Sequence, residues 1–138
     1  MIQRQQTLWL ILSTIAALLS FTFPFATGQL IEKNAAVFHK VDASSHFLLM
    51  LLTGASIALS GATIFLYKDR KLQMNLCMFG IVLSAGIFIF YITQMNKLDK
   101  ATLALYSILP LLVIVGYVLA YRNILKDEKL IKSLDKLR

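Results

Sequence analysis

The sequence has few of the residues on which secreted scaffolds, disordered chains and most soluble domains depend. One cysteine, two prolines and six glycines occur in 138 residues, and 15% of the residues are charged. A single cysteine excludes a disulfide scaffold, and the scarcity of proline and glycine excludes a collagenous or low-complexity chain. Because 58% of the residues are hydrophobic, intrinsic disorder and an ordinary soluble domain are also excluded. The composition is typical of a small membrane protein.

The sequence also lacks a recognisable catalytic, metal-ligating or nucleotide-binding motif. His39 and His46 lie seven positions apart, and Met50 follows one helical turn later. A second group of potential ligands for soft metals consists of Met74, Cys77 and Met78. Metals do bind such side chains, but methionine and free cysteine are also common packing residues in apolar interiors. We therefore expect no metal, no cofactor and no enzymatic activity.

Four apolar runs are long enough to cross a bilayer as helices, and they cover residues 8–25, 47–67, 76–93 and 101–121. A helix needs roughly 20 mostly apolar residues for this. None of the runs contains Asp, Glu, Lys, Arg or His, which disfavours ion-coupled transporters and proton relays. The first run exceeds the roughly 7–15 apolar residues of a signal peptide, so we expect it to remain as a span. We predict an all-α fold, in which a four-helix transmembrane bundle (residues 1–121) is followed by an amphipathic cytoplasmic C-terminal helix (residues 122–138).

The distribution of basic residues predicts the orientation of the spans. An even number of spans places both termini on one side, and that side carries ten Lys and Arg residues. The other side carries four, which are Lys33, Lys40, Lys97 and Lys100. Because short cytoplasmic loops are enriched in Lys and Arg, we predict that both termini are cytoplasmic. The net charge of +7 is then an orientation signal, and we expect no nucleic-acid partner.

The longest connection, residues 26–45, holds most of the polar side chains on the outer side. No alternation of apolar and polar residues within it is long enough to predict a strand. We expect Asp42, Ser44 or Ser45 to accept hydrogen bonds from the free backbone N–H groups that begin the second helix.

Small side chains fall on strips along the second and third spans. In the second span, one strip consists of Gly54, Ala58, Gly61 and Ala62, and the other of Thr53, Ser56, Ser60 and Thr63. In the third span, a narrower strip runs through Cys77, Gly80, Ser84, Ile87 and Tyr91. Helices in lipid associate by close backbone approach, so these strips are candidate packing surfaces, either within the bundle or against a different protein. In the fourth span, Pro110 predicts a kink near the middle of the helix.

The basic tail has the pattern of an amphipathic helix. One sector of a helical projection holds Ile124, Leu130, Ile131, Leu134 and Leu137, and the opposite sector holds Lys126, Lys129, Lys132 and Lys136. Glu128 precedes Lys132 in the order that favours an ion pair. We expect this helix to lie on the anionic lipids of the inner leaflet, or to dock its Leu and Ile side chains against a partner protein.

Two stretches, one at each end of the chain, resemble a known protein family. One is the opening MIQRQQTLWLIL, and the other is the end RNILKDEKLIKSLDKLR, in which Lys126, Asp127 and Glu128 are followed by Ser133, Asp135 and Arg138. They resemble a family of small four-span inner-membrane proteins of the Bacteroidota that is labelled only as a domain of unknown function. The resemblance implies a location in a bacterial inner (plasma) membrane, and it implies no activity and no functional residues.

Together these observations favour a non-enzymatic accessory or assembly subunit of a membrane complex, which binds a membrane-protein partner or forms a homo-oligomer. The main alternative is a small-molecule permease or transport subunit, in which Pro110 and the Ser/Thr strip of the second span line a path. A membrane enzyme that uses His39, Asp42 and His46 is a third alternative.

Overall fold

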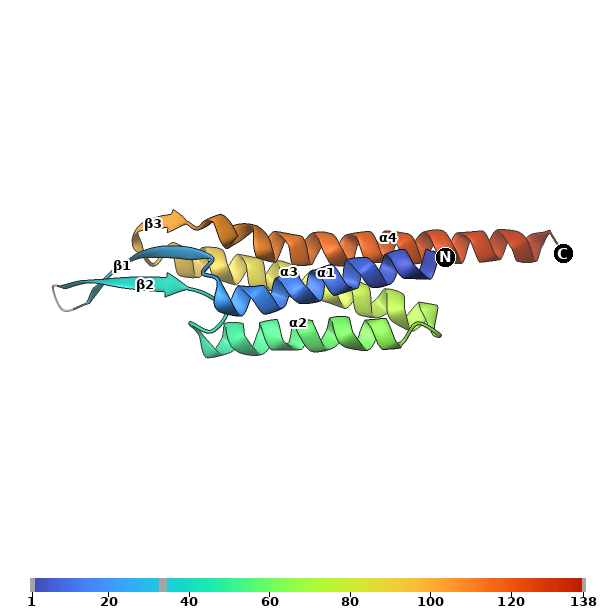
Figure 1. The fold of residues 1–138 in the computed structure, drawn as a ribbon, viewed down its shortest axis with the longest axis horizontal. Helices are drawn as coiled ribbons and strands as arrows, with labels where there is room; N and C mark the ends of the chain where they lie inside the picture. The colour runs from blue at the N-terminus through green and yellow to red at the C-terminus, as the bar shows by residue number, and fades with distance from the viewer. Residues whose placement is uncertain (1, 33–34, 138) are drawn as a thin grey trace.

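The computed structural model describes residues 2–32 and 35–137. Within them the chain forms the α-helices α1 (Ile2–Thr22), α2 (Phe47–Phe65), α3 (Arg70–Met95) and α4 (Ile108–Lys136), the last preceded by the 3-10 turn η1 (Leu105–Ser107). The β-strands are β1 (Ala26–Glu32), β2 (Ala35–Val41) and β3 (Asp99–Leu103). Figure 1 shows the helices side by side in one elongated bundle, with the strands at one end and both ends of the chain toward the other. Lys33 of the outer basic residues and Arg138 of the tail lie outside the described residues.

Each of these helices contains a stretch that is long and apolar enough to cross a membrane, by length and composition. Between 28% and 39% of the residues in these stretches are buried inside the protein. Large apolar side chains therefore cover the outside, and Leu8, Phe65 and Val82 are all more than 60% exposed. A continuous apolar exterior is what a lipid environment requires, and the prediction of apolar helices able to span a membrane is confirmed.

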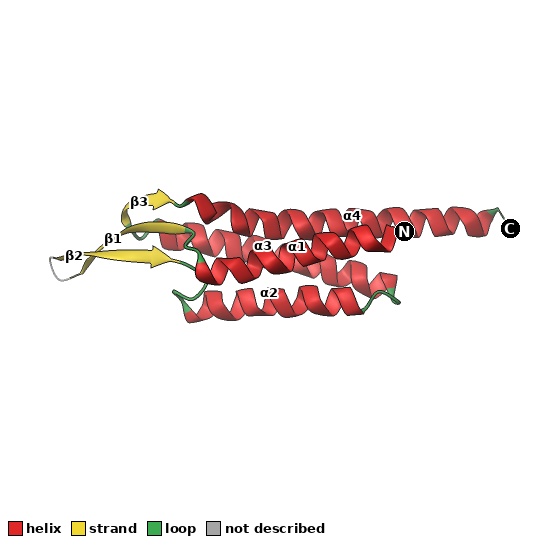
Figure 2. Cartoon of the chain, in the orientation of Figure 1, coloured by secondary structure: helices red, strands yellow, loops and turns green. Residues whose placement is uncertain are grey.

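The prediction of an all-α fold is wrong at the end of the bundle where the strands lie. The connection after α1 is a β-hairpin, and β3 joins it to give an antiparallel sheet in the order β2-β1-β3. Ala26 of β1 is paired with Val41 of β2 on one side and with Leu103 of β3 on the other. The backbone groups of residues 99–103 are thus satisfied by a strand, which is why the fourth helix begins later than the apolar run does (Figure 2).

Pro110 does not kink α4, so the prediction of a kink near the middle of that helix is also wrong. Because α4 begins at Ile108, Pro110 lies in its first turn. The N–H groups of the first turn have no partner within a helix, so a proline there removes no hydrogen bond. The proline fits the start of α4 without bending it.

The helix α4 passes without a break through residues 121 and 122, where the sequence predicts the boundary between bundle and tail. Its last turns project along the bundle axis beyond the neighbouring helices (Figure 1). The tail is therefore helical, but it is the continuation of the fourth span rather than a separate helix. The predicted ion pair between Glu128 and Lys132 is present at 3.0 Å.

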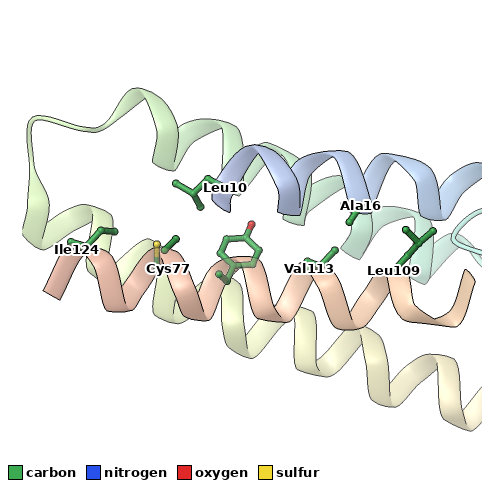
Figure 3. Close-up of a cluster of buried hydrophobic side chains, with 9 residues drawn as sticks. Leu10, Ala16, Cys77, Leu109, Val113 and Ile124 are labelled. Carbon is green, nitrogen blue, oxygen red and sulfur yellow. The ribbon is translucent and has the colours of Figure 1, made fainter. Parts of the chain in front are cut away.

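The core of the bundle lies where α1 and α3 pack against α4. Leu10 and Ala16 of α1, Val113 of α4 and Cys77 of α3 all belong to this buried cluster (Figure 3). Two glycines permit the close approach: a Cβ atom at Gly80 would lie 2.5 Å from the Tyr117 ring, and one at Gly116 would lie 2.8 Å from Ser13 Cβ. No side chain larger than hydrogen fits at these two contacts without displacement of a neighbour.

Candidate functional site

The interior of the bundle is lined with polar side chains. The Ser/Thr strip of α2 faces inward, and all four of its residues are at most 3% exposed. Buried polar side chains from the other helices are Gln6, Ser13, Ser20, Gln73, Ser84, Gln94 and Asp127. We call this set, together with the Ser/Thr strip, the interior polar side chains. The interior of the bundle thus combines the hydrophobic core with polar side chains, whereas large apolar side chains cover the outside.

Several interior polar side chains tie the helices together. Thr14 Oγ1 of α1 lies 2.7 Å from Ser60 Oγ of α2, and the Tyr117 hydroxyl of α4 donates a 2.8 Å hydrogen bond to the carbonyl of Ser56. The amide of Gln73 on α3 donates to the carbonyl of Thr63 at 3.3 Å. Hydrogen bonds between helices replace the hydrophobic driving force that is absent in lipid. The Ser/Thr strip is therefore a packing surface within the bundle.

A small cavity of about 10 Å³ lies among these hydroxyl groups. It is lined by Ala17, Ser20, Thr53, Ser56, Ser84, Ile87, Tyr91, Pro110 and Val113. Among the residues that the structure describes, Thr53 Oγ1, Ser56 Oγ and the Tyr91 hydroxyl have no hydrogen-bond partner. A space of this size accommodates about one water molecule, which would satisfy such groups. Pro110 lines this small cavity together with Thr53 and Ser56 of the Ser/Thr strip, whereas Ser60 and Thr63 do not line it.

The Gly/Ala strip of α2 faces the opposite way. Gly54, Ala58 and Ala62 are exposed, and Cβ atoms built at Gly54 and Gly61 would meet no described atom within 4 Å. Gly54 and Gly61 therefore make no close helix contact with the other described residues. Gly80 and Ser84 of α3 are buried, as are the other residues of their strip. Gly80 contacts Tyr117 of α4 rather than the Gly/Ala strip.

A buried acidic group lies at the end of the bundle opposite the sheet. Asp127 is 5% exposed, and its Oδ2 accepts a 2.6 Å hydrogen bond from Gln6 Nε2. Its Oδ1 has no hydrogen-bond partner in residues 2–32 and 35–137. The sequence places Asp127 in a solvated tail, but it lies three positions after the buried Ile124, and this helical spacing was the available signal of burial.

The remaining tail candidates are exposed. They are Lys126, Lys129, Leu130, Ile131, Lys132, Leu134, Lys136 and Leu137. The exposed fraction reaches 62% for Leu134 and 85% for Leu137. An apolar stripe thus continues along α4 beyond the point where the other helices cover it.

A second pocket, of about 220 Å³, lies between the sheet and the helix ends. It is lined by His39, Val41, Ser45, His46, Gln94, Lys97 and Leu98. We call it the sheet-end pocket. The structure thus brings His39 and His46 together, whereas Met50 points elsewhere and is 42% exposed. Sequence reasoning missed Gln94 and Lys97, although Gln94 continues the buried strip of α3 three positions after Tyr91.

The predicted cap of α2 is wrong. The residue before the helix is His46, and no side chain in the described chain caps the first turn by a hydrogen bond. Asp42 instead accepts hydrogen bonds from the backbone N–H and the hydroxyl of Ser44, at 3.0 and 2.7 Å. The side chains of Asp42 and Ser44 therefore bond to each other within this turn instead of to the first N–H groups of α2.

No group of three or more His, Cys, Asp or Glu side chains that could hold a metal ion occurs in the described residues. Cys77 is fully buried in the core, and Met78 is 51% exposed on the outside of α3. The second group of potential soft-metal ligands is therefore divided between two faces of one helix.

Residues 2–137 match the family described as a domain of unknown function, DUF4293. The chain belongs to the DUF4293 family. The resemblance to a family known only by such a label is confirmed, and the DUF4293 match covers bundle, sheet and tail together. No curated protein and no solved structure matches the chain.

The DUF4293 fold therefore offers features of different chemistry. The interior cavity suits water, the Gly/Ala strip suits a closely packed helix, and the end of α4 suits an apolar or anionic surface. The sheet-end pocket combines basic and amide side chains in a larger space, and it suits a small polar ligand.

Proposed function

We propose that this DUF4293 protein is a multi-pass protein of a bacterial inner (plasma) membrane and acts as a non-enzymatic accessory or assembly subunit. The observation that carries the proposal is the outward direction of the Gly/Ala strip, where Gly54 and Gly61 have open space around them. A helix with small residues on its lipid side allows another helix to approach closely. The partner is a membrane protein or a second copy of the chain.

The proposed orientation places both termini in the cytoplasm. The ends of the chain lie at the end of the bundle opposite the sheet (Figure 1). Lys68 lies in the turn between α2 and α3, and Arg70 and Lys71 are the first residues of α3, at that same end. The excess of Lys and Arg on this side supports the proposal through the positive-inside rule.

The exposed stripe at the end of α4 serves as a second docking surface in this proposal. Because α4 continues along the bundle axis, its last turns point away from the membrane plane rather than along it. This direction favours a partner protein over the anionic lipids of the inner leaflet as the main contact of Leu130 and Leu134. The lysines can still attract anionic head groups near the membrane surface.

The proposal is tested by isolating tagged protein in native nanodiscs and comparing Gly54→Leu with Gly86→Leu. Both glycines lie on outer helix faces where an added Cβ meets no described atom within 4 Å, so we expect neither change to disturb the fold. We expect wild type and Gly86→Leu to retain a stoichiometric membrane-protein partner or a second copy, and Gly54→Leu to lose it. Recovery of the same complex with Gly54→Leu would contradict the proposal.

The contribution of the tail is tested with Leu130→Gln/Leu134→Gln. A truncation after Asn123 is unsuitable because it removes the core residue Ile124 and the buried Asp127. We expect the double variant to weaken recovery of the partner. Recovery equal to wild type would assign docking to α2 alone.

A second candidate function, a permease or transport subunit, is favoured by the hydroxyl-lined cavity that Pro110 and the Ser/Thr strip share. The probe for this candidate is osmotic water permeability of proteoliposomes, measured by stopped-flow light scattering. Thr53→Val removes an unpartnered hydroxyl from the cavity, and Thr93→Val makes the same change at an exposed position of α3. A permeability above that of protein-free vesicles, reduced only by Thr53→Val, would favour transport over the accessory role.

A further inference from the structure

The sheet-end pocket is formed by elements from distant parts of the chain. β2 contributes His39, the turn before α2 contributes Ser45 and His46, and the end of α3 contributes Gln94 and Lys97. The volume of about 220 Å³ accommodates a group of several heavy atoms. Every one of these five side chains has at least one group that can donate a hydrogen bond.

The charge of the lining is of one sign. His39, His46 and Lys97 are basic residues, and no acidic residue is among the described residues that line the pocket. The nearest acidic residue along the chain to His39 is Asp42, whose Oδ1 is engaged by Ser44. The pocket therefore favours a negatively charged ligand.

The beginning of α2 at the pocket adds to this preference. α2 has 19 residues and begins directly after His46, and in the described chain no side chain caps its first N–H groups. Such groups and the helix dipole attract anions. At the end of α3 the carbonyls of Gln94 and Met95 accept hydrogen bonds from the N–H groups of Lys97 and Leu98, at 3.2 and 3.1 Å. These two carbonyls are thus already paired.

Gln94 provides an independent indication of a ligand. Its side chain is 8% exposed and lines the pocket, yet it forms no hydrogen bond with another described residue. The amide atoms of Gln94 are not among the described side-chain atoms that are both shielded from solvent and unpartnered, so the pocket leaves them accessible to water or to a ligand. A ligand oxygen in the pocket would accept the hydrogen bond that the Gln94 amide can donate.

We propose that the sheet-end pocket binds a small oxyanion, a phosphate or carboxylate group, held by Lys97, the two histidines and the Gln94 amide. The group belongs either to a free small molecule or to the head group of a lipid. Both sources offer the same oxygen atoms to the same donors, and the experiment distinguishes between them. The site is independent of the docking surfaces on α2 and α4.

The chain contains two histidines, and both line this pocket. Selective labelling of histidine with ¹³C at Cε1 therefore gives NMR signals from the pocket alone. The protein is held in non-ionic detergent at constant pH and titrated with inorganic phosphate, with acetate, or with short-chain phosphatidic acid. Sodium chloride at matched ionic strength is the control for a general salt effect.

We expect saturable shifts of both histidine signals with at least one of these oxyanions. Saturation with phosphate or acetate identifies a soluble ligand, and saturation with phosphatidic acid alone identifies a lipid head group. Lys97→Gln should weaken the affinity about tenfold, because it removes one charge-assisted hydrogen bond. Gln94→Leu should weaken it severalfold, and Lys100→Gln, which makes the same charge change on β3 outside the pocket, should leave it unchanged.

The proposal is overturned if no oxyanion gives a saturable shift, or if chloride shifts the signals equally. It is also overturned if Lys97→Gln binds as tightly as Lys100→Gln. Thermal unfolding of each variant, followed by the fluorescence of Trp9, shows whether the fold is retained. Trp9 lies on α1, away from the pocket residues, so its signal reports the bundle.

Discussion

At the scale of single residues, the packing of the bundle depends on a few positions where the size or the polarity of the side chain cannot change. Gly80 accepts the ring of Tyr117, and the hydroxyl of that ring then reaches the backbone of Ser56 on a third helix. Gly116 allows α1 and α4 to approach at Ser13. The sequence marks Gly80 as a packing residue, but it does not reveal that an aromatic ring is the partner.

Gly80→Ala is expected to destabilise the protein by about 1–3 kcal/mol, because the added methyl group overlaps the Tyr117 ring. Gly86→Ala makes the same change on the outside of α3, where the methyl group meets no described atom within 4 Å. It should leave the stability unchanged or raise it slightly through helix propensity. Thermal unfolding of the purified variants in detergent distinguishes the two, and equal stabilities would contradict the packing described here.

Truncation of the Asp127 side chain should lower the stability of the protein more than neutralisation of its charge. Asp127→Ala leaves the buried amide of Gln6 without its acceptor, and the expected cost is about 1–3 kcal/mol. Asp127→Asn keeps an oxygen that can accept from Gln6 and removes a buried, half-paired carboxylate, so its stability should equal or exceed that of wild type. Chemical or thermal unfolding measures both. A destabilised Asp127→Asn together with an unaffected Asp127→Ala would show that Gln6 is not the relevant partner.

At the scale of elements, the apolar runs predict the helices well and the strands not at all. The second run, 47–67, differs by two residues from α2 (Phe47–Phe65). The third run, 76–93, is extended at both ends in α3 (Arg70–Met95), because polar residues continue a helix where hydropathy no longer identifies one. Hydropathy identifies segments that satisfy their own backbone, which is a local property.

The sheet is not a local property, and this is why it was missed. Thr27 on β1 is paired with Thr102 on β3, at a distance of 75 residues along the chain. Each strand is short, and neither its length nor its alternation of side chains predicts it alone. The same reason applies to the sheet-end pocket: both histidines were recognised as candidates, but only the sheet shows that Gln94 and Lys97 lie beside them.

The pairing of β1 with β3 is tested by a disulfide. In a Cys77→Ser background, Thr27→Cys/Thr102→Cys should form a disulfide under mild oxidation, because the two hydroxyl oxygens lie 3.2 Å apart. Thr27→Cys/Asp99→Cys places the second cysteine out of register, opposite Gln29, and should not form one. Mobility on non-reducing gels gives the result, and a disulfide in the second variant alone would show a different register.

At the scale of the whole molecule, the outside of the bundle is apolar, unlike that of a water-soluble bundle, and the interior contains polar side chains beside its hydrophobic core. Hydroxyl and amide groups face inward, where they connect the helices, and leucine, isoleucine and phenylalanine cover the outside. The sheet and the turn between α2 and α3 lie at opposite ends of this apolar body (Figure 2). If the bundle crosses a membrane, these two ends lie in different aqueous compartments.

This arrangement predicts a difference in labelling between the two ends. In a Cys77→Ser background, Lys40→Cys on β2 and Lys132→Cys on α4 are both exposed to solvent. An impermeant maleimide added to intact cells whose outer membrane is permeabilised should label Lys40→Cys and leave Lys132→Cys unlabelled until the inner membrane is disrupted. Labelling in the reverse order would invert the proposed orientation, and simultaneous labelling would argue against a membrane between the two ends.

The uninterrupted course of α4 has a mechanical consequence. Pro110 lies in its first turn and Lys136 in its last, and at about 1.5 Å per residue the 29 residues form a rod of roughly 43 Å. A rod without a hinge transmits torque, so a twist that a docked partner applies at Leu134 also turns Tyr117 against Gly80. The load then reaches β3 through the short turn before α4. If the bundle crosses a membrane, α4 couples the two ends of the molecule mechanically across the bilayer.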